Sequence, residues 1–266
     1  MEVYIFDVEH GSCNAVIAPS GELILVDCGH NSTKGWRPSD WVIEKGAVIT
    51  NLTITNMDED HVSDLENVAK YCTIKSLSKN WHLTPEYVRR EKRQYGMGRG
   101  ISTAVSLMSD YTGPPLQTDW GGMNVQRFCH PTSKFSDLNS LSLITFAQFG
   151  GISIVFPGDL TKQAWKEFLN DPEFRSCLVK TNIFIASHHG REDGYCPEIF
   201  NYFTPSVIII SDKSVQYGTQ IVDYSSHAAG ITWNQTNTRH VLTTRKDGWF
   251  KIEQQAGGGF YIKASG

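Results

Sequence analysis

The sequence predicts a mixed α/β fold. Apolar runs rich in β-branched residues, typical of buried strands, recur along the chain and are separated by segments with apolar residues at helical spacing. Five of the apolar runs end in aspartate or histidine. With 266 residues, of which 40% are apolar and 20% charged, the chain suits one large globular domain or two small ones.

Charge and composition exclude several classes of protein. A net charge of −4 excludes binding of nucleic acid through bulk charge, so a phosphate-bearing substrate would need a local basic patch or a metal ion. No apolar run reaches the length of a membrane span and the start lacks the basic residues of a signal peptide, so we expect a cytoplasmic protein without membrane association. Six scattered cysteines, never in Cys-x-x-Cys, favour reduced core thiols.

The N-terminal part reads as an antiparallel meander. Strand-like runs over 3–8, 13–17 and 23–26 are separated by short glycine-containing turns, which predicts two successive hairpins. Asp27 ends the third run. It is either a turn former beside Gly29 or a carboxylate that orients a metal ligand, and the sequence leaves both open.

The central motif, Thr-Asn-Met-Asp-Glu-Asp-His over 55–61, joins a buried strand to a helix predicted over 62–71. Asp58, Asp60 and His61 place three potential ligands within four residues, and carboxylate oxygen and imidazole nitrogen suit divalent cations. The alternative is a polar turn with an aspartate that caps the helix. Taken alone, the motif favours neither.

Later strands end in the same residue types. Asp159, the pair His188-His189, and Asp212 follow apolar runs over 152–156, 181–186 and 207–210. Paired imidazoles before a glycine have no evident structural purpose. Active-site residues typically lie at strand ends, held by a rigid scaffold. The strand ends together therefore predict one site at one edge of a sheet, more strongly than any single one does.

Residues 78–118 differ from the rest of the chain. Thr84-Pro85-Glu86 is a good helix start, and a second helix is predicted over 101–111, closed by Gly113-Pro114-Pro115. The segment is basic, and the cations that we single out as phosphate ligands are Arg89, Arg90, Arg93 and Arg99. The alternative is a solvated helix face.

Together these residues resemble the metallo-β-lactamase superfamily, and most closely the hydrolase domain of ComEC-type competence proteins and their standalone relatives. Seven stretches carry the resemblance, in the expected order: Phe-Asp-Val-Glu-His-Gly (6–11), Val-Asp-Cys-Gly (26–29), Asn-Met-Asp-Glu-Asp-His (56–61), Asn-Ser-Leu-Ser-Leu (139–143), Gly-Asp (158–159), His-His-Gly (188–190) and Thr-Arg-Lys-Asp-Gly (244–248). The resemblance implies a four-layer αββα sandwich, a single domain over 1–266, and a helical insertion over 78–118.

The resemblance also implies a centre with one or two divalent ions, Zn or Mn. Asp60, His61 and His188 would hold one ion, while Asp159 would bridge to a second ion served by Asp58. Asp60 would take part in catalysis, and a proton donor near the leaving group would be one of two histidines, His189 or His227. Asp27, Asn56 and Asn139 would lie behind the ligands.

Two residues depart from the family pattern. Asn56 replaces the first histidine of the motif, and Asn139 stands where classical members carry a further histidine. An amide oxygen is a weaker donor than imidazole, so the second site favours Mn or Mg, or stays empty.

Two functions follow as hypotheses. One is a phosphodiesterase or nuclease that cleaves nucleic acid or a nucleotide with metal-activated water. The other is a catalytically decayed binding module for a protein partner or a nucleotide; a homodimer is compatible with either. Hydrolysis of a lactam, thioester or lactone is disfavoured, because those branches of the superfamily keep the full histidine motif.

Overall fold

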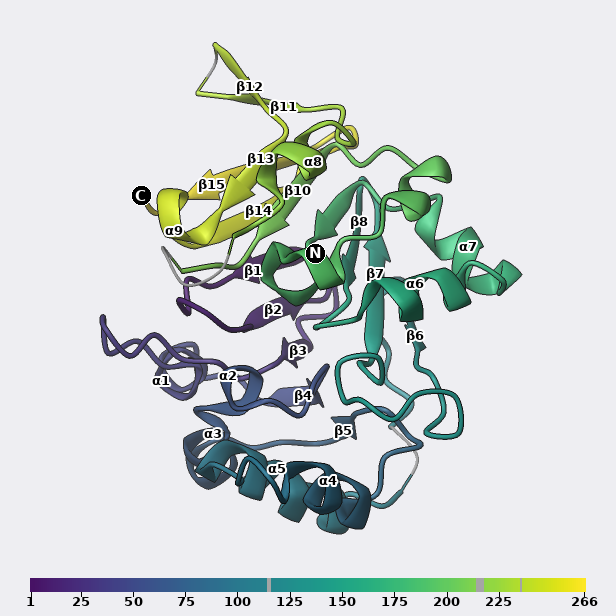
Figure 1. Ribbon diagram of the computed structural model, residues 1–266. Helices are drawn as coiled ribbons and strands as arrows, with labels where there is room; N and C mark the ends of the chain where they lie inside the picture. The colour runs from purple at the N-terminus through teal and green to yellow at the C-terminus, as the bar shows by residue number, and fades with distance from the viewer. Residues whose placement is uncertain (114–115, 214–217, 235) are drawn as a thin grey trace.

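The fold is an αββα sandwich, as the resemblance implied. A computed structural model describes residues 1–113, 116–213, 218–234 and 236–266. Pro114 and Pro115, predicted to close a helix within 78–118, lie outside the described residues. Two sheets face each other and helices cover both outer faces (Figure 1). Among the described residues, no helix is long and apolar enough to cross a membrane.

The first sheet contains the predicted N-terminal meander. Its strands, in spatial order, are β15 (Phe260–Ala264), β14 (Phe250–Gln254), β1 (Glu2–Ile5), β2 (Asn14–Ile17), β3 (Leu23–Val26), β4 (Ile49–Thr53) and β5 (Leu77–Ser78). The pairs β1–β2 and β2–β3 are antiparallel hairpin pairs, whereas β3–β4 is parallel. The chain between β3 and β4 carries helix α1 (Pro38–Glu44), since a parallel pair needs a crossover connection.

The second sheet supplies the other half of the strand ends. Its order is β13 (Val241–Thr243), β10 (Val207–Ile210), β9 (Ile183–Ile185), β8 (Ile152–Phe156), β7 (Ile144–Phe149) and β6 (Asn124–Phe128). Strands β8, β9 and β10 are parallel, so their carboxyl ends share one edge. A separate hairpin of β11 (Ile231–Trp233) and β12 (Asn237–Arg239) projects at the top of Figure 1.

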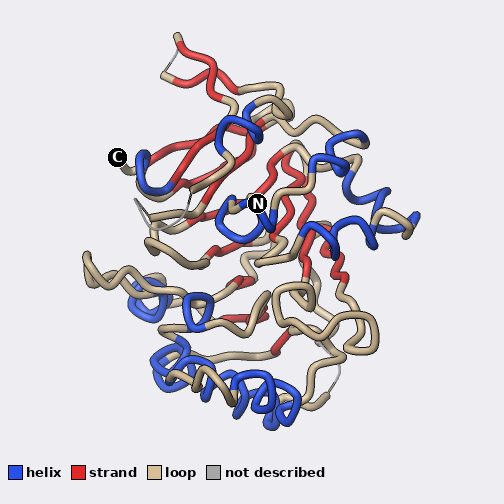
Figure 2. Tube along the Cα trace, viewed as in Figure 1, coloured by secondary structure: helices blue, strands red, loops and turns tan. Residues whose placement is uncertain are grey.

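Both faces of the central strands β3, β4, β8, β9 and β10 are buried, which explains the continuous apolar runs in the sequence. Successive strand side chains point to opposite faces, so Val3 and Ile5 pack between the sheets while Tyr4 packs under the outer helices. Helices α6 (Lys162–Phe168), α7 (Pro172–Leu178) and α8 (Ile221–Ser225) cover the second sheet. Figure 2 shows the strands in red between these helical layers in blue.

The segment 78–118 forms part of the helical layer over the first sheet. It contains α4 (Pro85–Lys92) and α5 (Arg99–Asp110), which lie beside α3 (Leu65–Tyr71) at the bottom of Figure 1. Val88 and Ile101 belong to the same buried cluster as Leu52 of β4. Helices α4 and α5 are therefore packed on the sheet rather than appended to the domain.

Candidate metal centre

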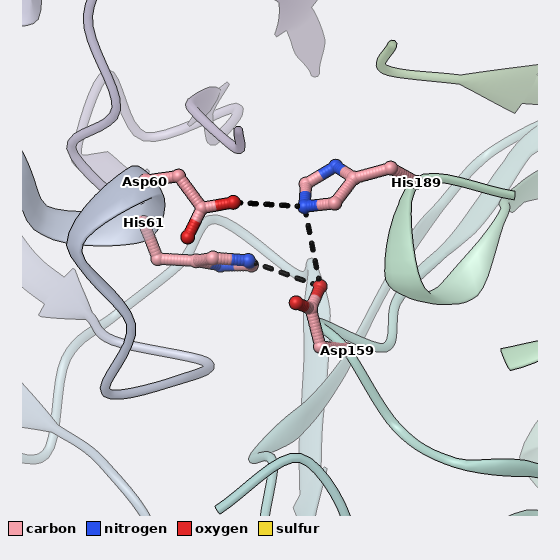
Figure 3. A group of neighbouring side chains, drawn as sticks. All are labelled: Asp60, His61, Asp159 and His189. Carbon is pink, nitrogen blue, oxygen red and sulfur yellow. Dashed lines mark hydrogen bonds and ion pairs between the residues drawn. The ribbon is translucent and has the colours of Figure 1, made fainter. Parts of the chain in front are cut away.

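Four side chains with metal-ligand chemistry converge between the two sheets. Asp60, His61, Asp159 and His189 each offer a ligand atom, and these atoms lie within 4.8 Å of one another (Figure 3). The first two belong to the short helix α2 (Glu59–Val62) after β4. Asp159 follows β8, and His189 lies in the 3₁₀ turn η1 (Ser187–Gly190) after β9. Each sheet thus supplies half of the cluster.

Asp27 fixes the orientation of His61. The Nδ1 of His61 lies 2.9 Å from Asp27 Oδ2, and its Nε2 lies 3.0 Å from Asp159 Oδ1. The fully buried Asp27 carboxylate also accepts hydrogen bonds from the backbone N–H and the hydroxyl of Thr55, at 2.7 and 2.6 Å. A carboxylate on one ring nitrogen selects the tautomer that turns the other nitrogen to a metal. The structure thus places Asp27 behind His61, on the side away from Asp159.

His189 is oriented in the same way by the main chain. Its Nδ1 lies 3.1 Å from the carbonyl oxygen of Ser211 and donates to it. Its buried Nε2 lies 3.3 Å from Asp60 Oδ2 and 3.5 Å from Asp159 Oδ1. A cavity of about 20 Å³, lined in part by His61, Asp159 and His189, has room for a single small occupant. The donor set therefore fits a divalent cation.

The neighbouring charges shift the pKa values of the cluster residues. Burial raises the pKa values of Asp60 and Asp159, but the neighbouring histidines lower both, that of Asp60 to about 2. Burial lowers the pKa of His61, yet Asp159 and Asp27 hold it well above its usual value. Both carboxyls are thus ionised at neutral pH and His61 carries a proton. A metal ion would have to displace that proton, as metals generally do at such sites.

The side chains of His188 and His189 make different contacts. Both residues have left-handed backbones, with φ of 48° and 55°, so the tight turn separates the two rings. His188 Nδ1 lies 2.9 Å from Asp193 Oδ1, and Arg191 donates to its Nε2 at 3.1 Å. That nitrogen is 3.6 Å from Asp159 Oδ2. The structure thus places His189 in the four-residue cluster and His188 beside it, whereas the resemblance implied His188 as the metal ligand and His189 as a proton donor.

Asp58 lies outside the four-residue cluster. Its carboxylate forms an ion pair with the Lys92 ammonium and accepts a hydrogen bond from Asn56 Nδ2 at 3.3 Å. The same Nδ2 donates to Asn139 Oδ1 at 2.8 Å, and Asn56 Oδ1 accepts from the Met57 N–H at 2.6 Å. The positions expected to serve a second ion are thus engaged with one another and with a lysine.

Comparison with known proteins gives a curated relative and a set of solved structures. No protein-family model matches the sequence. ComE operon protein 3 of Bacillus subtilis is 24% identical over 267 residues, a match that covers 93% of this chain. This confirms the resemblance to ComEC-type proteins. The chain spans 32%, about a third, of the length of that relative.

The solved structures are similar at low identity. A diphosphatase of the PhnP family is 11% identical with a TM-score of 0.47, over 94% of this chain and 97% of the other. The short form of human tRNase Z is 12% identical with a TM-score of 0.46, over 82% and 95%. A metallo-β-lactamase of Cronobacter sakazakii is 13% identical with a TM-score of 0.39, over 68% and 71%.

The remaining predicted site residues lie outside the four-residue cluster. His227 stacks on Phe200, with ring centroids 4.3 Å apart, and its Nε2 lies 2.8 Å from the Tyr195 hydroxyl. The arginines are exposed, and three of them pair with glutamates: Arg89 with Glu86, Arg90 with Glu91 and Arg99 with Glu66, while Arg93 is the exposed C-cap of α4. All four arginines are thus exposed to solvent, and their role as phosphate ligands stays a prediction.

Sequence reasoning missed several residues beside the cluster. His10 Nε2 lies 3.6 Å from Asp60 Oδ2, and burial together with the His189 charge lowers the pKa of His10 to about 4. Arg191 donates to His10 Nε2 at 2.6 Å. Arg191 also lines an open pocket of about 620 Å³ together with Lys162. Their positions in the sequence could have indicated them, because His10 follows the first strand and Arg191 follows His-His-Gly.

Proposed function

We propose that the protein is a metal-dependent hydrolase, and specifically a phosphodiesterase that acts on nucleic acid or a nucleotide. The observation that carries the proposal is the cluster of Asp60, His61, Asp159 and His189, in which both imidazoles turn Nε2 toward the carboxylates. Two nitrogens and two carboxylates suit Zn and Mn.

In such a centre the chain's own residues provide orientation and charge. Asp27 and the Ser211 carbonyl hold the two imidazoles, while Asp60 and Asp159 supply the anionic ligands. A bound cation would lower the pKa of a coordinated water and stabilise charge on a phosphoryl oxygen. In the hydrolysis, the water oxygen bonds to phosphorus, the bond from phosphorus to the leaving oxygen breaks, and the leaving oxygen takes up a proton.

The substrate class rests on local positive charge and on the resemblance. Lys162 and Arg191 line the pocket of about 620 Å³ beside Glu192 and Asp193, and Arg191 bridges His188 and His10 next to the cluster. A chain with a net charge of −4 needs such cations where it binds a phosphate. The resemblance to ComEC-type hydrolase domains favours a phosphodiester over a lactam or thioester.

The test is hydrolysis by purified protein without a histidine tag. With manganese, it should cleave at least one of single-stranded DNA, RNA and a cyclic dinucleotide, and Asp60→Ala should lose that activity and the bound metal. Asp40→Ala, at an exposed position of α1, is the control and should keep both. A wild type that is inactive on all three substrates with manganese, zinc and magnesium would refute the phosphodiesterase.

The binding module has one observation in its favour, the pairing of Asn56 with Asn139 in place of histidine ligands. Elemental analysis separates the two functions. A chain that purifies without metal and gains no thermal stability from manganese or zinc would be a binding module, since ligand binding to the folded state must raise its stability.

A further inference from the structure

A lysine lies beside the residue of the motif that was expected to serve a second metal ion. Asp58 precedes Asp60 by two residues on the same turn, yet only Asp60 joins the cluster. The Asp58 carboxylate pairs with the Lys92 ammonium instead. Lys92 is the last residue of α4, where the helix dipole favours a positive charge. The carboxylate expected to serve a second metal ion is thus already paired with a lysine.

The neighbouring amides offer no strong ligand to a second ion. Asn56 Oδ1 accepts from Met57 N–H, and Asn139 Oδ1 accepts from Asn56 Nδ2. A cation that recruited either oxygen would break one of these hydrogen bonds and would displace Lys92 from Asp58. Without imidazole, and with a neighbouring ammonium that repels it, such an ion would bind weakly.

Lys92 differs from the other cations of its helix. Its side chain is 12% exposed, against 49% for Arg89 and 61% for Arg90. Helix α4 is anchored by the fully buried Val88, which fixes where its last turn lies. In the segment 78–118, the Lys92 side chain is thus largely buried beside the motif 55–61, whereas the arginines are exposed to solvent.

We propose that Lys92 takes the place of a second metal ion, so that the centre holds one ion and the lysine supplies the second positive charge to a phosphoryl group. The inference rests on the proposed function and concerns the same site. An ammonium has three donors, and the Asp58 carboxylate does not use all of them. Lys92 thereby ties the outer helical layer to the site.

The first test counts metal ions by native mass spectrometry of protein saturated with manganese. The expected result is one ion per chain, in the wild type and in Asp58→Asn. Two ions in the wild type, falling to one in Asp58→Asn, would overturn the inference, because Asp58 would then be a metal ligand. A chain that binds no ion would refute both the inference and the proposed function.

The second test measures the Kd of inorganic phosphate for the manganese-loaded protein by calorimetry. Lys92→Met keeps the apolar stem and removes the charge, and should raise this Kd about tenfold, the size expected for one charge-assisted hydrogen bond. Lys92→Arg should restore affinity, and Arg89→Met is the matched control on the exposed face of the same helix. One bound ion with an unchanged Kd in Lys92→Met would refute the role of Lys92 and leave the proposed function standing.

Discussion

Asp27 determines which nitrogen of His61 faces the cluster, although Asp27 is not one of the four cluster residues. Its carboxylate accepts from His61 Nδ1 and from two donors of Thr55. We predict that Asp27→Asn lowers manganese affinity about 10- to 100-fold, the range for loss of a partner that orients a ligand. Chelator competition measures this affinity, and Asp40→Asn on the surface of α1 is the control. Equal affinities in the two variants would show that Asp27 only supports the fold.

Asp212 gives metal-free protein a pH-dependent stability. Burial raises the pKa of this carboxyl to about 6, and the nearby Arg245 offsets only part of the shift. Between about pH 4 and about pH 6 the folded chain binds more protons at this group than the unfolded chain, so stability falls as the pH rises through this window. Above about pH 6 the loss of stability is complete, and it amounts to at most about 3 kcal/mol for a pKa shift of about two units.

Substitution of Asp212 should therefore matter more at high pH than at low pH. In urea unfolding, Asp212→Asn should gain stability relative to wild type between about pH 4 and about pH 7, by up to about 3 kcal/mol. A difference between the two proteins that does not change with pH would contradict the shifted pKa.

Residue types could be predicted at this scale, but conformations could not. The rule that carboxylates and histidines end the strands found all four cluster members. It could not tell His188 from His189, because left-handed φ values at both positions decide which ring faces the site. The partner of Asp58 was also beyond reach, since it depends on how α4 packs.

At the scale of elements, α5 holds α2, the helix that carries Asp60 and His61. The Glu59 side chain accepts from the backbone N–H groups of Gly100 and Ile101, at 2.9 and 3.2 Å. A Cβ on Gly100 would overlap the Val62 carbonyl oxygen at the end of α2. Alanine usually stabilises a helix relative to glycine by about 1 kcal/mol. Because Gly100 lies so close to Val62, alanine should here lower the stability of the protein instead of raising it.

We predict that Gly100→Ala destabilises the protein by about 1–3 kcal/mol, the range for overpacking, and weakens manganese binding because α2 must shift. Urea unfolding and metal titration measure the two effects. Ser102→Ala, exposed on the same helix, should leave both within about 0.5 kcal/mol of wild type. A more stable Gly100→Ala protein would show that α2 and α5 can move apart freely.

Element types were more predictable than their places. The cap and proline at Thr84-Pro85 start α4 as predicted, because local hydrogen bonding suffices there. The strands of both sheets also follow their apolar runs. That α4 and α5 form a layer over β4 depends on contacts between distant parts of the chain, which no local pattern encodes.

For the molecule as a whole, the candidate metal centre links the two sheets. Asp60 and His61 extend from the first sheet, and Asp159 and His189 from the second. An ion at about 100 times its Kd should add about 2.7 kcal/mol to the free energy of unfolding. For a chain of this size that raises Tm by about 5–10 °C. Thermal melts with and without manganese measure it, and a comparable rise in Asp60→Ala would place the binding elsewhere.

The backbone at the centre also carries a cost for the rest of the fold. Asp27, His188 and His189 all have φ between 48° and 62°, a conformation that glycine adopts readily and other residues do not. At about 1 kcal/mol or more each, these three residues forgo about 3 kcal/mol of the roughly 5–15 kcal/mol that separates a folded domain from its unfolded chain. Selection for stability alone would have placed glycines here. The chain has an aspartate and two histidines at these positions instead of glycines, and it loses folding stability as a result.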